Sequence, residues 1–187
     1  MRSIALVVGL MTGVGLLTAS VVPPTVAADL QGGDERQVVL RDDCDPTDPG
    51  WTPTGGCSLP EGDVNLAEFN AYLLSPLAPS VIGHPAWWFD PGYLKVRAGK
   101  RIKIANAGGR THTFTEVANF GGGRVPPLNA GQPGTAALIP APECLAPGVI
   151  NLPGGARDVV EGLAPGDHRF QCCIHPWMRT LVKVGED

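Results

Sequence analysis

Three side chains that favour soft metals lie within seven residues near the end of the chain. The segment FQCCIHPWMR, residues 170–179, holds Cys172, His175 and Met178 in the spacing Cys-x2-His-x2-Met. Thiolate and imidazole bind copper or zinc, and a thioether adds a preference for copper. A trigonal His2Cys set with a long axial methionine is the blue-copper arrangement. The loop therefore predicts three ligands of one copper ion.

The second histidine ligand must come from another part of the chain. His112 follows a strand-like segment and an Ala-Gly-Gly-Arg turn, where its side chain can reach a neighbouring loop. The chain has four histidines. We interpret His84, in GHPAWW, as a packing residue beside two tryptophans, and His168 as a hydrogen-bonded residue at the rim. His112 is therefore the predicted fourth ligand.

Only one of the two adjacent cysteines has the Cys-x2-His spacing. Side chains alternate across a strand, so Cys172 and Cys173 point to opposite faces. The chain has five cysteines, an odd number. With Cys172 as the ligand, the other four can pair as Cys44–Cys57, which staples an acidic loop, and Cys144–Cys173. The second bond would hold a long proline-rich segment against the ligand strand. The alternative is that Cys144 and Cys173 are free thiols.

The N-terminus has the pattern of a secretory signal. Met1 and Arg2 precede the apolar run IALVVGLMTGVGLLTASVV, and small residues follow up to Ala28. This pattern predicts a signal peptide over residues 1–28, cut after Ala28. An uncleaved membrane anchor is the alternative. A cleaved signal implies a secreted or periplasmic protein with no remaining membrane span, in a compartment where disulfides persist.

After the predicted signal peptide, the first part of the chain is acidic and the rest is mildly basic. Residues 29–187, which number 159 (187 − 28), suit one domain plus an extension. Net charge is −4, but residues 29–70 hold ten acids and two bases, whereas residues 71–187 hold eight acids and eleven bases. We therefore predict an acidic N-terminal extension over 29–88, with a disulfide-stapled loop, and a second domain over 89–187. Neither part has the dense basic patch that a nucleic-acid partner requires.

Periodicity predicts an all-β protein with one short helix. Asn65 and Glu68 form a capping-box pattern, which predicts a helix over 66–74. Alternating apolar and polar residues predict at least six strands. Six are a pair in YLKVRAGKRIKIAN from residue 93 with a tight connection at Ala98-Gly99-Lys100, residues 111–117, a pair formed by 156–163 and 168–173, and residues 179–184; residues 36–41 could form a further strand. These strands favour an antiparallel sandwich. The long Gly- and Pro-rich segment 118–155 lacks clear periodicity.

Residues 89–184 resemble the cupredoxins, the blue-copper family that includes plastocyanin and amicyanin. The resemblance lies in the strand with a turn at Ala98-Gly99, in Asn106 six residues before His112, and in Cys172-x2-His175-Pro176-x-Met178. The short ligand loop is most similar to that of amicyanin. The family implies an eight-stranded Greek-key sandwich, and a mononuclear type 1 copper held by His112, Cys172, His175 and Met178.

The resemblance also implies roles for other residues. Asn106 would tie the two ligand-bearing segments together by hydrogen bonds. His175, with Pro176 and Trp177, would lie at the surface as an electron port. The implied function is one-electron transfer with a redox partner protein, by a monomer that is not an enzyme. Residues 29–88 have no counterpart in the small cupredoxins.

Other readings remain beside this one. A copper-binding or copper-delivery protein outside the cytoplasm would use the same ligands. Four histidines and no His-x-His pair argue against an added catalytic copper cluster. The acids around Asp42 could suggest calcium, but their spacing fits no EF-hand loop. The basic residues between Lys95 and Arg110 are interpreted as a solvated sheet face, with docking of an acidic partner as the alternative.

Overall fold

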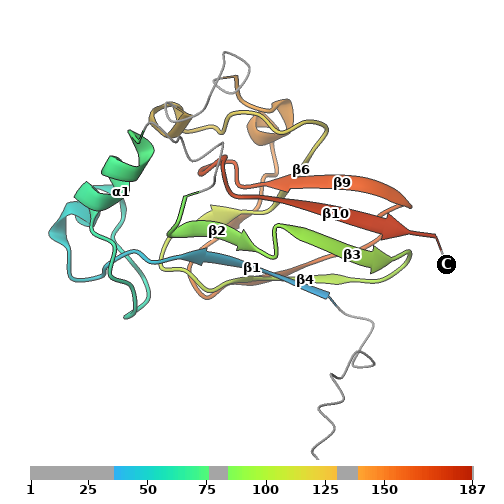
Figure 1. The fold of residues 1–187 in the computed structure, drawn as a ribbon, viewed down its shortest axis with the longest axis horizontal. Helices are drawn as coiled ribbons and strands as arrows, with labels where there is room; N and C mark the ends of the chain where they lie inside the picture. Colours follow the sequence, from blue (N-terminus) through green and yellow to red (C-terminus); the bar gives the residue numbers. More distant parts are fainter. Residues whose placement is uncertain (1–35, 76–83, 130–138, 187) are drawn as a thin grey trace, which may run out of the picture. The chain divides into compact units, whose positions relative to one another are not determined.

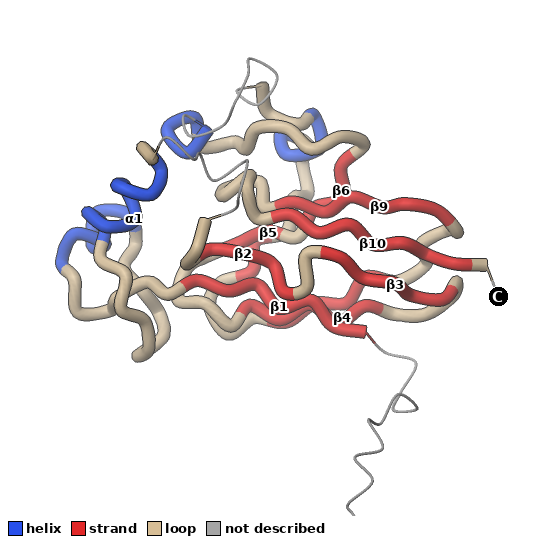
Figure 2. The backbone as a smooth tube through the Cα atoms, viewed as in Figure 1, coloured by secondary structure: helices blue, strands red, loops and turns tan. Residues whose placement is uncertain are grey.

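The computed structural model describes residues 36–75, 84–129 and 139–186. The predicted signal peptide, residues 1–28, lies outside the described residues. The described chain is mostly β, with two four-stranded sheets, a two-stranded ribbon, one α-helix and short 3-10 helices (Figures 1 and 2). The predicted all-β sandwich with a short helix is therefore confirmed. None of the described helices has the length and apolar character needed to span a bilayer.

The first sheet has the strand order β2-β1-β4-β8. Strand β1 is antiparallel to β2 and parallel to β4, and β4 is antiparallel to β8. Its strands are β1 (Arg36–Asp42), β2 (Trp87–Asp90), β4 (Ile102–Asn106) and β8 (Arg157–Val160). The predicted boundary between residues 88 and 89 thus falls within β2, and β1, from the predicted extension, is part of the sandwich.

The second sheet has the order β3-β10-β9-β6. Strand β10 is parallel to β3 and antiparallel to β9, and β9 is antiparallel to β6. The short strands β5 and β7 form the separate ribbon. The bounds are β3 (Tyr93–Arg97), β5 (His112–Thr113), β6 (Thr115–Val117), β7 (Asn151–Leu152), β9 (Gly166–Gln171) and β10 (Arg179–Gly185). The chain passes repeatedly from one sheet to the other, as in Greek-key sandwiches.

Two predicted strand pairs are wrong. Strands β3 and β4, joined by the tight Ala98-Gly99 turn, lie in different sheets, and so do β8 and β9. Each turn connects the two sheets instead of closing a hairpin within one sheet. The prediction of a purely antiparallel sandwich is also corrected, since β1 with β4 and β3 with β10 are parallel pairs.

Alternating apolar side chains from both sheets form one core. Val38 and Leu40 of β1 and Ile102 and Ile104 of β4 are at most 1% exposed. They share a cluster with Leu94, Val96, Phe170, Val182 and Val184 of the second sheet. Burying a side chain of this size contributes about 1.5–3 kcal/mol. The core is therefore the rigid support on which the loops at the strand ends are held.

A short helix and a disulfide-stapled loop lie beside one end of the sandwich (Figure 1). Helix α1 (Leu66–Leu73) begins as predicted, with the Asn65 side chain accepting a hydrogen bond from the Glu68 amide at 2.8 Å. The preceding loop contains the 3-10 helix Pro49–Thr54 and the predicted disulfide Cys44–Cys57. Phe69 of α1 packs against Trp51 of this loop and Trp87 of β2, with ring centroids 5.3 and 4.7 Å away.

The long segment between β6 and β7 is tied to the ligand strand. It contains the 3-10 helices Pro126–Asn129 and Pro142–Leu145. The predicted disulfide Cys144–Cys173 joins the second of these helices to the residue beside Cys172, across a sequence separation of 29. Cys144 and Cys173 share a small core of their own with Val117 and Ala141. Both predicted disulfides are confirmed, and Cys172 is the free cysteine.

Candidate metal centre

His112, Cys172 and His175 bring one sulfur and two imidazoles together in the interior. Their ligand atoms all lie within 4.8 Å of one another. The Cys172 Sγ is 3.8 Å from His112 Nδ1 and 3.7 Å from His175 Nδ1, and the two nitrogens are 3.1 Å apart. All three residues are at most 6% exposed. Two nitrogens and a sulfur therefore converge on one buried point.

The loop between β9 and β10 supplies three of the four predicted ligands. Its ends are fixed because Gln171 and Arg179 are paired residues of the two strands. The Cys172 amide donates to the Met178 carbonyl at 3.0 Å, and the Met178 amide donates to the His175 carbonyl at 2.9 Å. Met178 is fully buried. The short loop is thus folded back on itself, which places the thioether residue next to the other ligands.

Thr113 joins the two ligand-bearing segments. Its amide points at the Cys172 Sγ, 3.4 Å away, and its hydroxyl accepts a hydrogen bond from the Cys173 amide at 2.7 Å. The His175 amide also donates to the Cys172 sulfur, at 3.4 Å. Two amides directed at one sulfur stabilise a thiolate. Sequence reasoning missed Thr113, and its position directly after His112 was the available signal.

Asn106 fixes the approach to His112. Its side-chain amide donates to the carbonyls of Arg110 and Leu152 at 2.7 and 2.8 Å, and its Oδ1 accepts from the Gly108 amide at 2.9 Å. Leu152 is the strand partner of His112. These bonds tie the turn before His112 to β7. Direct hydrogen bonding between the His112 and Cys172 segments comes from Thr113, which thus has the role that the family resemblance implies for Asn106.

Asp42 is a buried carboxylate behind His112. The Asp42 Oδ2 is 2.7 Å from His112 Nε2, on the far side of the ring from the other ligands, and neither side chain is exposed. Asp42 also accepts from the amides of Gly109 and Arg110 at 2.8 and 3.0 Å. A carboxylate bound to one ring nitrogen fixes the tautomer, so that the other nitrogen is free to bind a metal. Sequence reasoning treated Asp42 as one of several loop acids.

The charges of the site depend on one another. Burial alone would lower the pKa of His112, but Asp42 and Cys172 raise it to about 9. Burial alone would raise the pKa of Cys172, but His112 and His175 hold it well below its usual value. The pKa of His175 is lowered, mainly by burial. The cluster therefore favours a thiolate, which is the form of cysteine that binds metals.

The predicted electron port is covered. His175 and Trp177 are each 6% exposed, and Pro176 is fully buried. Trp177 lies against Phe69 of α1 and against His84, with ring centroids 6.0 and 5.8 Å away. The expectation of a surface-exposed imidazole is therefore corrected. In this chain the cover comes from Phe69 of α1 and from His84.

The remaining candidates have structural roles. His168 is hydrogen-bonded to Glu116 and to the Ala164 carbonyl, as expected for a rim residue. His84 is buried among aromatic rings, as expected for a packing residue. Asp45 accepts from Thr47, and Asp48 accepts from the amides of Gly50 and Leu66. These carboxylates act in turns and caps, so the structure offers no support for the calcium alternative.

The donor set fits copper. Copper prefers a thiolate, two neutral imidazoles and an adjacent thioether as ligands. A structural zinc site usually has four Cys or His ligands instead. His112 offers Nδ1 because Asp42 engages its Nε2. The sulfur and the two nitrogens already face one another without a fourth hard ligand from a described residue. The predicted ligands His112, Cys172 and His175 are therefore together, with Met178 buried beside them.

Comparison with solved structures gives a consistent likeness. The chain is similar to cupredoxins. A purple cupredoxin from Nitrosopumilus maritimus is 13% identical, with a TM-score of 0.40, and the match covers 80% of this chain and 99% of that one. A reduced amicyanin mutant is 18% identical (TM-score 0.34; 50% and 69% covered), and a fern plastocyanin mutant is 20% identical (TM-score 0.35; 55% and 91% covered).

No protein-family model and no curated protein matches the chain. Sequence identity to the solved structures is low, and so are the TM-scores.

Proposed function

We propose that the protein binds one copper ion through His112, Cys172, His175 and Met178 and transfers single electrons outside the cytoplasm. The observation that carries this proposal is the convergence of one sulfur and two imidazole nitrogens within 4.8 Å, in the interior of a β-sandwich. The two disulfides support a location in an oxidising compartment.

The side chains suit a metal that alternates between two charges. A bound copper ion would supply a one-electron couple. Sulfur from Cys172 and Met178 favours Cu(I), and the imidazoles of His112 and His175 keep Cu(II) accessible. The thiolate receives two amide hydrogen bonds, which reduce its electron donation and raise the reduction potential.

The surroundings hold the ligands in place during a change of charge. Asp42 fixes the ring of His112, and Thr113 fixes the loop that bears Cys172 relative to the strand that bears His112. Because the ligands are buried and hydrogen-bonded, they have little room to rearrange. Little rearrangement means a small reorganisation energy, which is what rapid electron transfer requires.

The same geometry disfavours copper delivery, the alternative function. A delivery protein must release its ion to a partner, which needs at least one accessible ligand. Here His112, Cys172 and Met178 have no measurable exposure, and His175 is 6% exposed. A buried site should exchange copper slowly and still exchange electrons.

The experiment is voltammetry of the copper-loaded protein, followed by incubation with a strong Cu(I) chelator. Electron transfer predicts a reversible one-electron wave and copper that stays bound through repeated cycles. Rapid loss of Cu(I) to the chelator, without a reversible wave, would favour delivery. A Cys172→Ser variant is the matched control, since it should lose the wave.

A further inference from the structure

A line of aromatic rings runs from the ligand His175 to the protein surface. The ring of His175 is 5.6 Å from that of Trp177, which is stacked on His84 at 5.8 Å. His84 in turn is 5.3 Å from Tyr72 of helix α1. The first three rings are at most 6% exposed, whereas Tyr72 is 38% exposed. The line begins at a ligand and ends in solvent.

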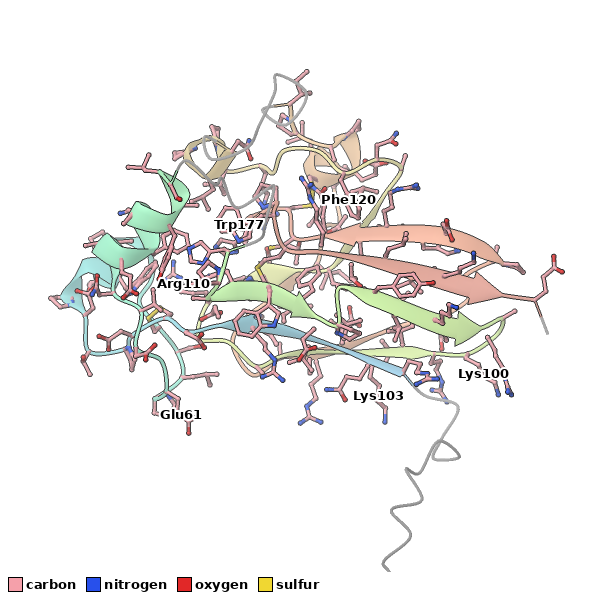
Figure 3. The ribbon with its side chains drawn as sticks, viewed as in Figure 1. Glu61, Lys100, Lys103, Arg110, Phe120 and Trp177 are labelled. Atoms are coloured by element: carbon pink, nitrogen blue, oxygen red, sulfur yellow. A yellow bond between two sulfur atoms is a disulfide. The ribbon has the colours of Figure 1, made fainter. Side chains whose placement is uncertain are left out.

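We propose that these four rings, the aromatic relay (His175, Trp177, His84 and Tyr72), conduct electrons between the metal site and a positively charged redox partner that docks on α1. This inference rests on the proposed electron-transfer function. His175 is covered, so a partner above it is separated from the ligand by a layer of side chains. Figure 3 shows Trp177 on the side of the sandwich that α1 covers.

Contact between neighbouring rings favours electronic coupling along the relay. Coupling between a donor and an acceptor falls steeply with distance, and it falls less across groups in contact than across gaps. Neighbouring rings of the relay have centroids 5.3–5.8 Å apart, within the range of direct aromatic packing. The relay therefore connects His175 to Tyr72 without a break.

The surroundings of the relay keep the reorganisation energy low. The Nε2 of His84 and the Nε1 of Trp177 are buried and have no hydrogen-bond partner among the described residues. Burial lowers the pKa of His84 to about 4, so its ring is neutral at pH 7. A passing charge therefore meets few dipoles that must reorient.

Charge around α1 defines the kind of partner. Between Arg41 and Lys95 the sequence has no lysine or arginine. Of the acids in that stretch, Glu61, Asp63 and Glu68 are exposed and Asp43, Asp45 and Asp48 are partly exposed, whereas Asp42 is buried at the metal centre and Asp90 is paired with Arg41. Glu68 is exposed one helical turn before Tyr72, so the two lie on the same side of α1. Arg110, from the turn before His112, donates to the carbonyls of Thr54 and Gly56 and packs on Trp51.

An acidic surface attracts a cationic partner and raises its rate of encounter. Leu74, which is 81% exposed, adds a small apolar contact beside Tyr72. A small apolar spot within a charged surface suits the weak, short-lived complexes of redox proteins. The partner is therefore expected to present a basic rim around an apolar centre.

The test uses hexaammineruthenium(II) as a cationic electron donor. Each complex gives up one electron, becoming ruthenium(III), while Cu(II) in the protein becomes Cu(I). Stopped-flow rates are compared for the wild type, Tyr72→Leu and Tyr72→Phe. Tyr72→Leu removes the ring at the exposed end of the relay and changes the docking site. Changes at one interface typically alter association rates by about one to three decades. We expect about a tenfold lower rate for Tyr72→Leu and a wild-type rate for Tyr72→Phe, which keeps the ring.

Tyr93→Leu is the matched control, because Tyr93 is 48% exposed on β3 and lies outside the relay. It should react as the wild type does. The optical spectrum and reduction potential are measured first for every variant. A wild type without a blue, reversible site would overturn the proposed function itself. With the site intact, a wild-type rate for Tyr72→Leu, or an equal loss for Tyr93→Leu, would overturn the relay.

A second experiment measures where the cation docks, with a probe that cannot transfer electrons. Redox-inert, paramagnetic hexaamminechromium(III) is added to the Cu(I) protein, and broadening of backbone amide NMR signals is mapped. Broadening centred on residues 66–74 supports docking on α1. Broadening centred on the outer faces of the sheets, with α1 unaffected, overturns it.

Discussion

Asp42 holds His112 from the side opposite the other ligands. Its carboxylate binds the ring nitrogen and two backbone amides in the turn that precedes His112. Burial alone would raise the pKa of Asp42, but these hydrogen bonds lower it, so the carboxylate is charged. At the scale of single residues, the ligand geometry depends on Asp42 and Thr113 as much as on the ligands themselves.

Replacing Asp42 tests this dependence. Asp42→Asn removes the negative charge. It also replaces one accepting oxygen by an NH2 group, which then faces an N–H donor and loses that hydrogen bond. Loss of such an outer partner typically costs about 10–100-fold in metal affinity, and we expect that loss here. Competition with a copper chelator measures it. Asp43→Asn, a neighbouring change without contact to His112, should bind copper as the wild type does. Equal affinities for both variants would refute the positioning role of Asp42.

His84 makes stability depend on pH. Burial lowers its pKa from 6.5 to about 4 in the folded protein. Between these values the unfolded chain binds more protons than the folded one, so the free energy of unfolding falls as the pH falls. A shift of about 2.5 pKa units (6.5 − 4) corresponds to about 3 kcal/mol. This contribution is fully present above pH 6.5.

Denaturant unfolding of the metal-free protein at pH 7 and pH 4.5 measures the effect. The wild type should lose stability between these two values, and His84→Gln, which cannot titrate in this range, should lose less. The same pH dependence in both proteins would assign it to other groups.

At the scale of elements, the sequence determined the strands better than their partners. Period-two patterns located β1, β3, β4 and β10, because alternate residues of each strand are buried, and they also located β9, where burial does not alternate. The patterns did not show that the turn at Ala98-Gly99 crosses between sheets, since a tight turn fits either a hairpin or a crossover. They also missed β2, where Trp87 and Phe89 are buried but Trp88 is a third large apolar residue that hides the alternation.

Some residues of the candidate site could likewise be predicted from the sequence, and others could not. The copper ligands follow from residue type and spacing, and the disulfides follow from the odd cysteine count and strand alternation. Asp42 and Thr113 could not be predicted, because their roles arise from contacts between segments 59–70 residues apart. The cover over His175 was likewise unforeseen, since it depends on where α1 packs.

The Cys144–Cys173 disulfide supports the ligand strand from outside. It links residues separated by 29 positions, and in the chain-entropy model such a bond contributes about 3.5 kcal/mol. Cys144→Ser and Cys173→Ser should each lower the free energy of unfolding by about this amount and leave a copper-binding protein. The double variant should lose no more than either single one. Denaturant unfolding measures all three, and additive losses would show that the cysteines act independently.

At the scale of the whole molecule, the segment before β2 does more than extend the sandwich. It contributes β1 to a sheet, Asp42 to the metal centre, and α1 to the cover over His175. Residues 36–75 thus complete the site that the later strands begin. Their acidic character also sets the charge of the surface through which we propose that electrons pass.

Optical and electron spin resonance spectra of the copper-loaded protein test the central claim most directly. A thiolate from Cys172 bound to Cu(II) with two imidazoles predicts an intense thiolate-to-copper charge-transfer band and a colour that reduction abolishes and reoxidation restores. Cys172→Ser should fold, since its neighbours keep both disulfides, and should lack that band. A wild type that binds one Cu(II) per chain and stays colourless, with the same spectra as Cys172→Ser, would contradict the copper–thiolate site.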